Sequence, residues 1–491
     1  MGGRRTSHPA RAGQEETQVA AAEGGRNLTL ADVTVTDERV ARRAVMAAAI
    51  GNLTEWYDFG VYSYLTAIIS KVFFANLSPG LATLATLATF AASFLIRPFG
   101  GLFFGPLGDR IGRTKVLATT VILMACGTTL LGVIPSYAAI GAAAPVLVLF
   151  ARLVQGFSTG GEYAGAMTFI AEYAPDKRRG FLGSWLEFGT LTGYTFGALL
   201  VTLLTAVLGD QRMLSWGWRI PFLIALPIGV TGLYLRLRLE ETPAFEQLVA
   251  KSPQHGGTAI RDDFRLIFTR HWRALLLVGG LVIAWNVTNY MLTSYMPTYL
   301  TTTLPRHGER GTSSMAANVL QIVVLLVLMV IVTFLGRLSD RVGRRPVLMT
   351  GSLALVVLGV PMVLLLQVGG IGPTFLGLMM MGLSLVCFSS TAPSTLPAMF
   401  PTEIRYGGLS IAFNIFVSAF GGTTAAVMGA LILATGNLLW PGYYLMAAGV
   451  VGAVCVYFVR ESARRPLAGA NPAVASEEEA RELVAQAQAD R

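Results

Sequence analysis

The chain has 491 residues, of which 53% are hydrophobic and only 13% are charged, and its net charge is +9. A soluble protein has roughly 25% charged residues, so this deficit indicates a chain whose main solvent is lipid. The positive charge does not indicate nucleic-acid binding, because the basic residues lie between apolar runs and form no basic tract. Composition therefore excludes a soluble globular protein and a nucleic-acid-binding protein.

Twelve apolar runs follow the polar first residues of the chain. Each is long enough to cross a hydrocarbon core of roughly 30 Å as a helix. Backbone groups must be paired inside lipid, and the runs lack the short alternating pattern of a β-barrel, so we predict an all-α membrane protein. The predicted spans are 43–71, 81–106, 115–135, 145–172, 180–208, 217–238, 272–301, 315–337, 346–366, 372–398, 406–434 and 439–460.

The basic residues in the gaps between spans predict the topology. The even-numbered gaps are rich in Arg and Lys. The odd-numbered gaps contain only Lys71, Arg212, Arg219, Arg306 and Arg310. Because cytoplasmic loops carry an excess of Lys and Arg, we predict that the even gaps and both termini are cytoplasmic.

A charged motif occurs twice. Gly105-Pro-Leu-Gly-Asp-Arg-Ile-Gly-Arg-Thr-Lys115 follows the second span, and Gly336-Arg-Leu-Ser-Asp-Arg-Val-Gly-Arg-Arg-Pro346 follows the eighth. Glycine permits a tight turn and aspartate can cap a helix or pair with arginine, so we expect a latch on the cytoplasmic face. A basic loop that only sets topology is the alternative. The predicted gating residues are Asp109, Arg110, Arg113, Asp340, Arg341 and Arg344.

The repeat also predicts the domain organisation, since each copy follows the second span of a six-span half. We expect two six-helix bundles, at 43–238 and 272–460. A cytoplasmic N-terminal tail at 1–42, a cytoplasmic linker at 239–271 and a cytoplasmic C-terminal tail at 461–491 complete the chain. The last residues, 476–491, form a short Ala/Glu-rich segment that is too short for a stable coiled coil.

Several stretches resemble a known family. They are Gly51-Asn-Leu-Thr-Glu-Trp-Tyr-Asp-Phe59, Gln155-Gly-Phe-Ser-Thr-Gly-Gly-Glu-Tyr163, Trp216-Gly-Trp-Arg-Ile-Pro-Phe222, Glu240-Glu-Thr-Pro-Ala-Phe245 and Phe400-Pro-Thr-Glu-Ile-Arg-Tyr406. With the duplicated motif, they resemble the metabolite:proton symporter family of the major facilitator superfamily. Four further stretches resemble its osmoprotectant branch: Leu28-Thr-Leu-Ala-Asp-Val-Thr34, Asn286-Val-Thr-Asn-Tyr-Met291, Ser394-Thr-Leu-Pro-Ala-Met-Phe400 and Arg465-Pro-Leu-Ala-Gly-Ala470.

The resemblance implies a fold and a function. The fold is that of the major facilitators, and the function is proton-coupled symport of proline, glycine betaine or a related zwitterion into the cell by alternating access. It also implies the bacterial inner membrane, a monomer, and H⁺ as coupling ion with no other cofactor. Symport of an anionic metabolite, such as 2-oxoglutarate or an aromatic acid, is the alternative, because related symporters carry such anions.

Acidic side chains lie within spans of the first half only. An ionisable group in a spanning helix costs on the order of 2.5 to 3.5 kcal/mol, so each needs a partner or a use. Glu55 and Asp58 share one helix face with Tyr62, and Arg152, Gln155 and Glu162 form a polar stripe on the fourth span. The predicted proton-coupling residues are Asp58, Glu162, Arg152, Glu55 and Glu187.

We predict that Asp58 or Glu162 carries the proton and that Arg152 is its switchable counter-charge. A carboxylate in an apolar site holds its proton more tightly, whereas a nearby arginine favours its release, so movement between the two could transfer a proton. Permanent ion pairs that hold helices together are the alternative.

A zwitterion with a weakly hydrogen-bonding cationic centre requires an aromatic box and an acid. Ordinary packing is the alternative for each aromatic side chain. The predicted substrate-binding residues are Trp56, Tyr57, Tyr62, Arg97, Gln155, Trp285, Asn286, Tyr290, Tyr295 and Asn414.

Other classes of membrane protein fit the sequence less well. There is no His-Glu-x-x-His and no phosphate-binding Gly-x-x-x-x-Gly-Lys loop, so neither a metalloprotease nor a nucleotide-driven pump is indicated, and we expect no enzyme. The three cysteines lack metal-ligand spacing, so we expect no metal. Duplicated halves with acids in only one of them favour alternating access over a static channel.

Overall fold

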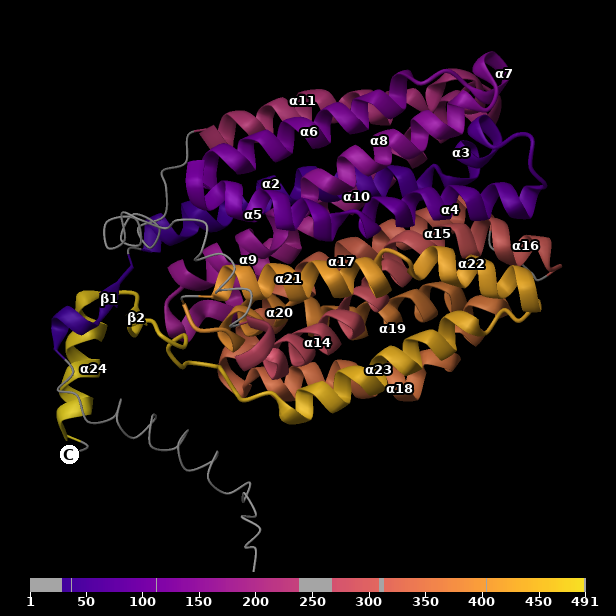
Figure 1. Ribbon diagram of the computed structural model, residues 1–491. Helices are drawn as coiled ribbons and strands as arrows, with labels where there is room; N and C mark the ends of the chain where they lie inside the picture. The colour runs from indigo at the N-terminus through magenta and orange to yellow at the C-terminus, as the bar shows by residue number, and fades with distance from the viewer. Residues whose placement is uncertain are drawn as a thin grey trace, which may run out of the picture.

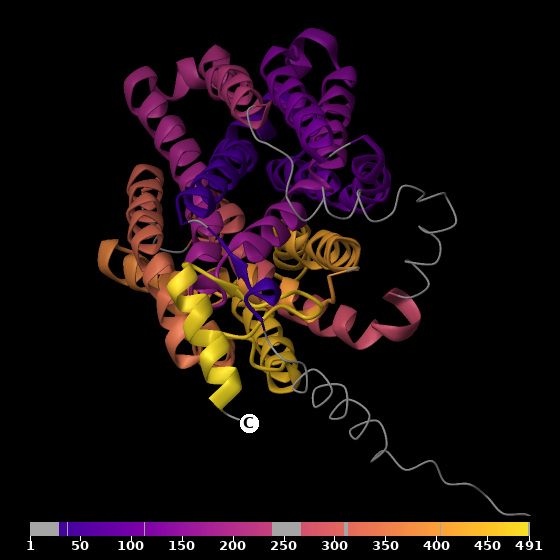
Figure 2. The same ribbon diagram turned by 90° about the vertical axis from the view of Figure 1, so that its left-hand side faces the viewer.

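The computed structural model describes residues 29–36, 38–111, 113–237, 267–308, 313–402 and 404–489. The side chains of 105–118 lie outside the described part of the chain, as does most of the predicted linker, at 239–266. Figures 1 and 2 show two helix bundles packed against each other, one built from the first half of the chain and one from the second.

The first bundle contains the predicted spans one to six. Three of these spans consist of more than one helix. The helices are α2 (Glu38–Tyr64) and α3 (Thr66–Phe73), α4 (Pro79–Leu95) and α5 (Arg97–Ile111), α6 (Arg113–Val133), α8 (Ala143–Thr159) and α9 (Glu162–Tyr173), α10 (Arg179–Arg212), and α11 (Arg219–Leu237). Short turns join some of them: α7 (Tyr137–Ile140), η2 (Asp176–Arg178) and η3 (Met213–Gly217).

The second bundle contains spans seven to twelve. Its seventh span is α14 (Trp272–Tyr290), η4 (Met291–Tyr295), α15 (Met296–Thr298), η5 (Tyr299–Thr303) and α16 (Leu304–Arg306). The next two are single helices, α17 (Ser314–Val342) and α18 (Arg344–Val368). The others are α19 (Ile371–Ser389) with α20 (Ala392–Thr395) and η6 (Pro397–Met399), then α21 (Arg405–Phe416) with η7 (Val417–Gly421) and α22 (Thr424–Thr435), and α23 (Trp440–Phe458).

Among the described residues, nine helices are long and apolar enough to cross a membrane. Two shorter apolar segments, Thr119–Val133 and Arg219–Thr231, belong to the predicted third and sixth spans. The predicted first span is α2 with α3, whose acids Glu55 and Asp58 lower its hydropathy. Within the described part of the chain, these segments account for the twelve expected spans.

Some of the twelve spans are interrupted within the bundle. The fourth span is interrupted at Gly160 and Gly161, between α8 and α9. The expected polar stripe from Arg152 to Glu162 therefore crosses this junction. The seventh span contains two π-turns around Pro297, which has no N–H to donate to the helical ladder.

Glycines allow spans one and five to cross at short range. A Cβ added at Gly193 would lie 2.6 Å from the carbonyl oxygen of Leu53, and one at Gly197 would lie 3.0 Å from the nitrogen of Val61. Close contact through small residues is the usual basis of helix association in membranes. This crossing sets the orientation of α2 and therefore the direction in which its Glu55 and Asp58 point.

The two tails meet outside the bundles. Strand β1 (Thr34–Val35) pairs in parallel with β2 (Ala473–Val474), and α24 (Glu477–Ala489) packs on this pair through Val33, Val474 and Ala480. Figure 2 views the molecule from the end where these elements lie. The sequence did not predict this contact between the start and the end of the chain.

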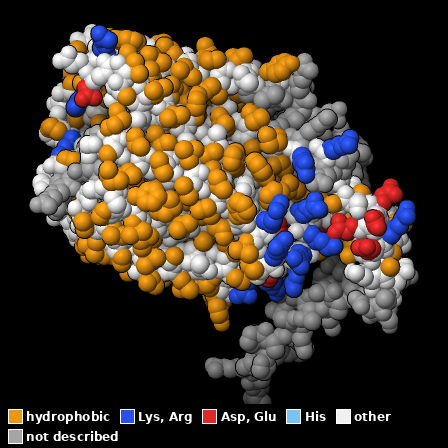
Figure 3. Space-filling model, turned by 180° about the vertical axis from the view of Figure 1, so that it is seen from behind, with side chains coloured by type: hydrophobic (Ala, Val, Ile, Leu, Met, Phe, Trp, Pro, Cys, Tyr) orange, Lys and Arg blue, Asp and Glu red, His pale blue; other side chains and the backbone are white. Residues whose placement is uncertain are grey.

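The surface supports a membrane location. Figure 3 shows a broad face of hydrophobic side chains, with Lys and Arg gathered at the end that carries α24. Exposed large apolar side chains come from both bundles, for example Phe150, Phe334 and Tyr457. Such an apolar belt with basic residues at one end is the pattern expected of a multi-pass membrane protein.

Candidate substrate and proton site

Two ion pairs connect one face of α2 to other spans. Glu55 and Asp58 are one turn apart on this helix, and each carboxylate meets an arginine from another span. The four side chains are all buried, with at most 2% of their surface exposed. Burial of a charge is tolerated only when it is paired, so each pair depends on both of its members.

Asp58 is the centre of a polar network inside the first bundle. Its Oδ2 lies 3.0 Å from Nη1 of Arg152, and its Oδ1 accepts a hydrogen bond of 2.9 Å from Nε2 of Gln155. Gln155 also contacts Thr128 on the third span at 2.7 Å. The Arg152 guanidinium lies 4.1 Å from the centre of the Tyr62 ring. The predicted contact between Asp58 and Arg152 is therefore present, and it joins spans one, three and four.

Glu55 pairs with Arg97, which begins α5. The Arg97 guanidinium lies 5.1 Å from the centre of the Phe94 ring, and Phe94 in turn lies 4.9 Å from the Tyr290 ring of the second bundle. This second ion pair is therefore close to the boundary between the two halves.

An aromatic cluster occupies that boundary. Trp56 contacts Tyr163, Tyr194 and Tyr290, with ring centres 5.6 to 5.9 Å apart. Tyr163 stacks on Phe413 of the second bundle at 5.0 Å. Trp285 completes the cluster, 6.0 Å from Tyr163 and 5.9 Å from Phe413. Both halves therefore contribute rings to one buried cluster.

Several donors of the two arginines make no hydrogen bond. These are Nε and Nη1 of Arg97 and Nε and Nη2 of Arg152, all buried and without a partner among the described residues. A guanidinium presents five N–H donors, and a buried donor without a partner is unfavourable by about 1–3 kcal/mol. Both arginines therefore have spare capacity to bind an anionic group.

Glu187 and Glu162 lie nearer to the second bundle than Asp58 does. The Glu187 carboxylate accepts a hydrogen bond from the hydroxyl of Tyr163, the residue whose ring stacks on Phe413. Glu162 is buried in the first turn of α9, next to Gly161, whose carbonyl accepts a hydrogen bond from Tyr406 of the second bundle. The structure therefore divides the predicted acids between two surroundings.

Some predicted substrate residues point elsewhere. The Tyr57 hydroxyl donates to the carbonyl of Pro221 in the sixth span, and that of Tyr62 contacts Thr86 and Thr89 in the second. Tyr295 packs on Tyr299. These three contacts are interior packing within one bundle.

Asn414 lies at the boundary between the halves, whereas the contacts of Asn286 are within the second bundle. The Asn414 amide donates to the carbonyl of Gly160 in the fourth span. The Asn286 amide donates to the carbonyl of Val282 within its own helix, and its Cβ packs against Gly421. Sequence reasoning missed Tyr163, Tyr194, Phe94 and Phe413. Tyr163 directly follows Glu162, a signal that could have found it.

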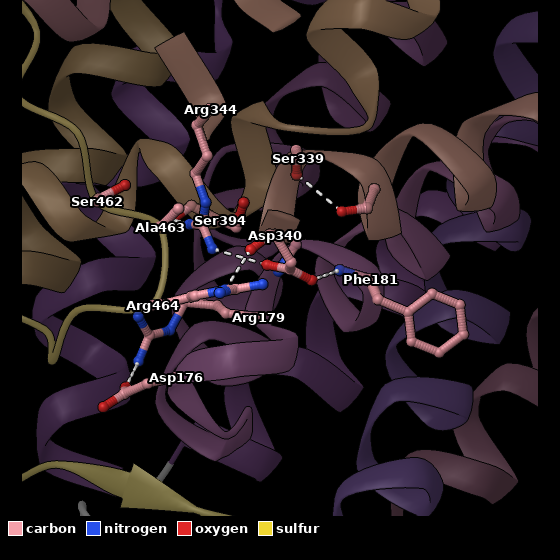
Figure 4. A network of polar contacts seen from close by, with 12 residues as sticks. Asp176, Arg179, Phe181, Ser339, Asp340, Arg344, Ser394, Ser462, Ala463 and Arg464 are labelled. Atoms are coloured by element: carbon pink, nitrogen blue, oxygen red, sulfur yellow. Dashed lines mark hydrogen bonds and ion pairs between the residues drawn. The ribbon is translucent and has the colours of Figure 1, made fainter. Parts of the chain in front are cut away.

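The second copy of the charged motif joins the halves (Figure 4). The Asp340 carboxylate accepts hydrogen bonds of 2.8 Å from the backbone N–H groups of Gly180 and Phe181, in the first turn of α10. Arg344 holds the same carboxylate at 3.2 Å and donates to the carbonyl of Ser394 at 2.7 Å. Asp340 thus caps a helix of the other bundle, where unpaired N–H groups and the helix dipole favour a negative charge.

The motif glycines have two different roles. Gly343 has φ +100° and forms the turn between α17 and α18, as expected. Gly336 lies inside α17, where a Cβ would meet Ser184 Oγ at 2.5 Å and the Gly180 carbonyl at 2.8 Å. The expectation of a tight turn is therefore wrong for Gly336, which permits close contact between the halves. Arg341 is exposed.

The first copy of the motif can be traced only in part. Asp109 and Arg110 lie in α5 and Arg113 begins α6, but their side chains lie outside the described residues.

The C-terminal segment reinforces the junction at the same end. Arg464 Nε donates to the carbonyl of Asp340 at 2.8 Å, and Asp176 Oδ2 accepts from the backbone of Ala473 at 3.1 Å. Arg405 of the second bundle pairs with Glu172 of the first at 2.9 Å. The end of the molecule that carries the tails is therefore closed in this structure.

One segment has the pattern of a hydrolase nucleophile. Residues 156–160 read Gly-Phe-Ser-Thr-Gly, but they lie at the end of the buried helix α8 and not on a strand-to-helix turn. The Ser158 hydroxyl donates to the carbonyl of Gln155. Its glycines allow spans two and four to touch, since a Cβ at Gly160 would collide with the backbone of Arg97. Among the described residues, no His, Cys, Asp and Glu side chains form a group that could hold a metal ion.

Comparisons with known proteins agree with this architecture. A family model described as sugar (and other) transporter matches residues 44–473. The chain is 48% identical over 462 residues to a proline/betaine transporter of Salmonella typhimurium, covering 93% of this chain and 91% of that protein. It is 47% identical to the glycine betaine/proline/ectoine/pipecolic acid transporter OusA of Dickeya dadantii, with the same coverage.

A solved structure shows the same fold. It is the major facilitator superfamily proton:xylose symporter XylE bound to 6-bromo-6-deoxy-D-glucose, with a TM-score of 0.69, 19% identity, and coverage of 87% of this chain and 97% of that chain. At that identity the likeness concerns the fold alone. The chain therefore belongs to the sugar (and other) transporter family and is a multi-pass membrane transporter with the major facilitator fold.

Proposed function

We propose that the protein imports a small zwitterionic osmolyte, such as proline or glycine betaine, together with a proton. The observation that carries this proposal is the position of Arg97, a buried arginine with spare donors, next to aromatic rings from both halves. The names of the relatives support it, since they are called proline/betaine and glycine betaine/proline/ectoine/pipecolic acid transporters.

A zwitterion has two ends that this site can recognise separately. Arg97 Nε and Nη1 can each donate to a carboxylate oxygen. A quaternary or secondary ammonium has few or no hydrogen-bond donors, and aromatic faces such as those of Trp56 and Tyr290 attract it. Because the rings come from both bundles, a bound substrate would draw the halves together around itself.

Proton coupling is assigned to the network around Asp58. While Asp58 is ionised, it is held by Arg152 and Gln155. A shift of the fourth span that withdraws Arg152 would leave a carboxylate buried without its counter-charge, which then takes up a proton. Return of Arg152 would release it. Glu55 and Glu187 line the substrate side, so they are the alternative proton carriers.

The transport cycle further needs gates. We assign the cytoplasmic gate to Asp340 and Arg344, whose contacts tie α17 to α10, and its release opens the pathway inward. We assign the end with the tails to the bacterial cytoplasm, because Lys and Arg are concentrated at that end of the face seen in Figure 3. The protein would act in the inner membrane as a monomer, since each chain contains both halves of the pathway, and it would need no cofactor besides H⁺.

Symport of an anionic metabolite is the second candidate. The two buried arginines favour it, because both have spare donors. The aromatic cluster favours the zwitterion, because a dicarboxylate gains nothing from the negative faces of these rings.

Uptake into proteoliposomes separates the two candidates. Radiolabelled glycine betaine, proline and 2-oxoglutarate are offered with and without an inwardly directed proton gradient. We expect betaine and proline to accumulate only with the gradient and 2-oxoglutarate to stay outside. Entry of 2-oxoglutarate while betaine and proline both fail would refute the osmolyte assignment.

A further inference from the structure

An apolar groove lies at the cytoplasmic ends of spans one and five, far along both helices from the substrate site. It is a cavity of about 310 Å³ whose walls come from the first turns of α2, the turn before α10, the first turns of α10, and Ala475 after β2. Its lining is mainly Val45, Met46, Leu182, Phe181 and Trp185. Nothing in the transport mechanism uses this cavity.

The groove has charged residues at its edge. Arg42 and Arg178 belong to its lining, and both are exposed. Lys177, the neighbour of Arg178, is 63% exposed and pairs with Glu479 of α24 at 2.7 Å. An apolar slot flanked by two arginines is complementary to a molecule with a hydrocarbon part and an anionic head.

The level of the groove determines where such a molecule comes from. Phe181 is in the first turn of α10, and its backbone N–H donates to Asp340 at the cytoplasmic gate. The lining of α2 lies in its first three turns, before the buried part that carries Glu55. The groove is therefore at the boundary between bilayer and cytoplasm, where basic side chains meet the phosphates of the inner leaflet and apolar surface meets the acyl chains.

We propose that this groove binds one anionic phospholipid of the inner leaflet, with an acyl chain between α2 and α10 and its phosphate between Arg42 and Arg178. The lipid would contact span one, Phe181, whose backbone N–H donates to Asp340, and Ala475 after β2. Bound there, it would hold together elements from both ends of the chain.

Quenching of Trp185 fluorescence tests the proposal. The full-length protein is reconstituted in phosphatidylcholine with increasing fractions of phosphatidylglycerol, and bromine is placed on the acyl chains of either lipid. The signal of Trp185 is obtained as the difference between the wild type and Trp185→Phe. We expect half-maximal quenching at a mole fraction at least threefold lower for brominated phosphatidylglycerol than for brominated phosphatidylcholine.

Matched variants distinguish recognition of the lipid head group from binding of the acyl chain. Arg42→Gln with Arg178→Gln should abolish the preference for phosphatidylglycerol, whereas Arg460→Gln with Arg481→Gln, two arginines outside the groove lining, should retain it. Ala475→Leu, which fills the groove without changing charge, should reduce quenching by both lipids. Equal quenching by the two lipids, or a preference that survives in the Arg42 and Arg178 variant, would overturn the proposal.

Two controls address other occupants. Glycerol phosphate, a soluble head group, should leave the quenching unchanged at millimolar concentration; competition by it would show a site for free phosphate and overturn the lipid assignment. A chain without residues 1–28 should behave as the wild type. Stronger quenching after this truncation would show that the N-terminal segment occupies the groove, and would overturn the proposal as well.

Discussion

At the scale of single residues, the site depends on charges that are buried in pairs. Glu55 with Arg97 and Asp58 with Arg152 have almost no exposed surface. Removal of one member of a buried pair is unfavourable by about 3–5 kcal/mol, because the other charge is left uncompensated. Conservative substitutions therefore report on function more cleanly than truncations do.

Arg97 gives the first prediction. Arg97→Lys retains the charge but loses the planar set of donors, so we expect the KM for betaine to rise about tenfold with kcat little changed. Arg97→Gln should abolish uptake. The measurement is initial-rate uptake in proteoliposomes, with thermal unfolding as a check on folding. A KM for Arg97→Lys equal to that of the wild type would show that Arg97 does not bind the carboxylate.

Glu461 gives a prediction about pH. Burial raises the pKa of this carboxyl, but hydrogen bonds from the backbone N–H groups of Arg344, Arg345, Ser462 and Ala463 outweigh burial, and the pKa lies below its ordinary value. A group with a lowered pKa stabilises the fold above its unfolded pKa, about 4.3, and this stabilisation is lost as the pH falls through the folded pKa.

The test compares the wild type with Glu461→Gln. The wild type should unfold at a higher temperature at pH 7, and the difference should shrink as the pH falls below about 4.3. Thermal unfolding in detergent between pH 3.5 and 7 measures it. A difference that is independent of pH would mean that the carboxylate charge does not stabilise this junction.

Helix periodicity predicted part of the site. It placed Glu55 and Asp58 on one face of α2, and buried charge alone predicted that Arg97 and Arg152 need partners. Which arginine pairs with which acid depends on the crossing of α2 with spans two and four, and no local pattern encodes that crossing. Phe413 was missed because an isolated aromatic residue in an apolar helix resembles ordinary packing.

At the scale of elements, hydrophobic length predicted the spans, whereas breaks within them came from local backbone chemistry. Pro297 and the paired glycines Gly160 and Gly161 mark two of these breaks. The contact between β1 and β2 involves only two residues of each strand. A pairing this short produces no periodic pattern that could be recognised in the sequence.

The crossing of α10 with α17 gives a prediction at this scale. A Cβ at Gly180 would lie 2.6 to 2.8 Å from atoms of Ser339, Asp340 and Gly336, so Gly180→Ala must push the helices apart. Overpacking of this kind is unfavourable by about 1–3 kcal/mol. We expect a lower unfolding temperature and slower betaine uptake.

Gly372→Ala is the matched control. No described atom lies within 4 Å of a Cβ at Gly372, and its φ is not in the left-handed region. This variant should unfold and transport like the wild type. If both alanine variants behave alike, close contact at Gly180 is not what holds the two helices together.

At the scale of the whole molecule, specific polar contacts join the two halves at the end with the tails. The N–H groups of the first turn of a helix have no partner within that helix, so the amides of Gly180 and Phe181 depend on Asp340. Asp340→Asn should speed hydrogen exchange of these two amides at least tenfold. Asp210→Asn, an exposed change at the other end, should not.

Exchange is measured by mass spectrometry of peptides that cover the start of α10. Unchanged protection in Asp340→Asn would mean that the junction at the end with the tails is held by other contacts, such as the pair of Arg405 with Glu172. The duplicated motif thus predicted a junction between the halves, but only the structure identified the helix end that Asp340 caps.

Transport by Asp58→Asn tests the central claim most directly, namely that a proton on Asp58 couples the movement of the halves to the proton gradient. The asparagine resembles a permanently protonated Asp58, so substrate can still exchange across the membrane while the gradient has no effect. We predict that counterflow of betaine persists at a rate within a few-fold of the wild type and that gradient-driven accumulation disappears, while Asp210→Asn retains both. Accumulation by Asp58→Asn to the wild-type level would contradict the claim.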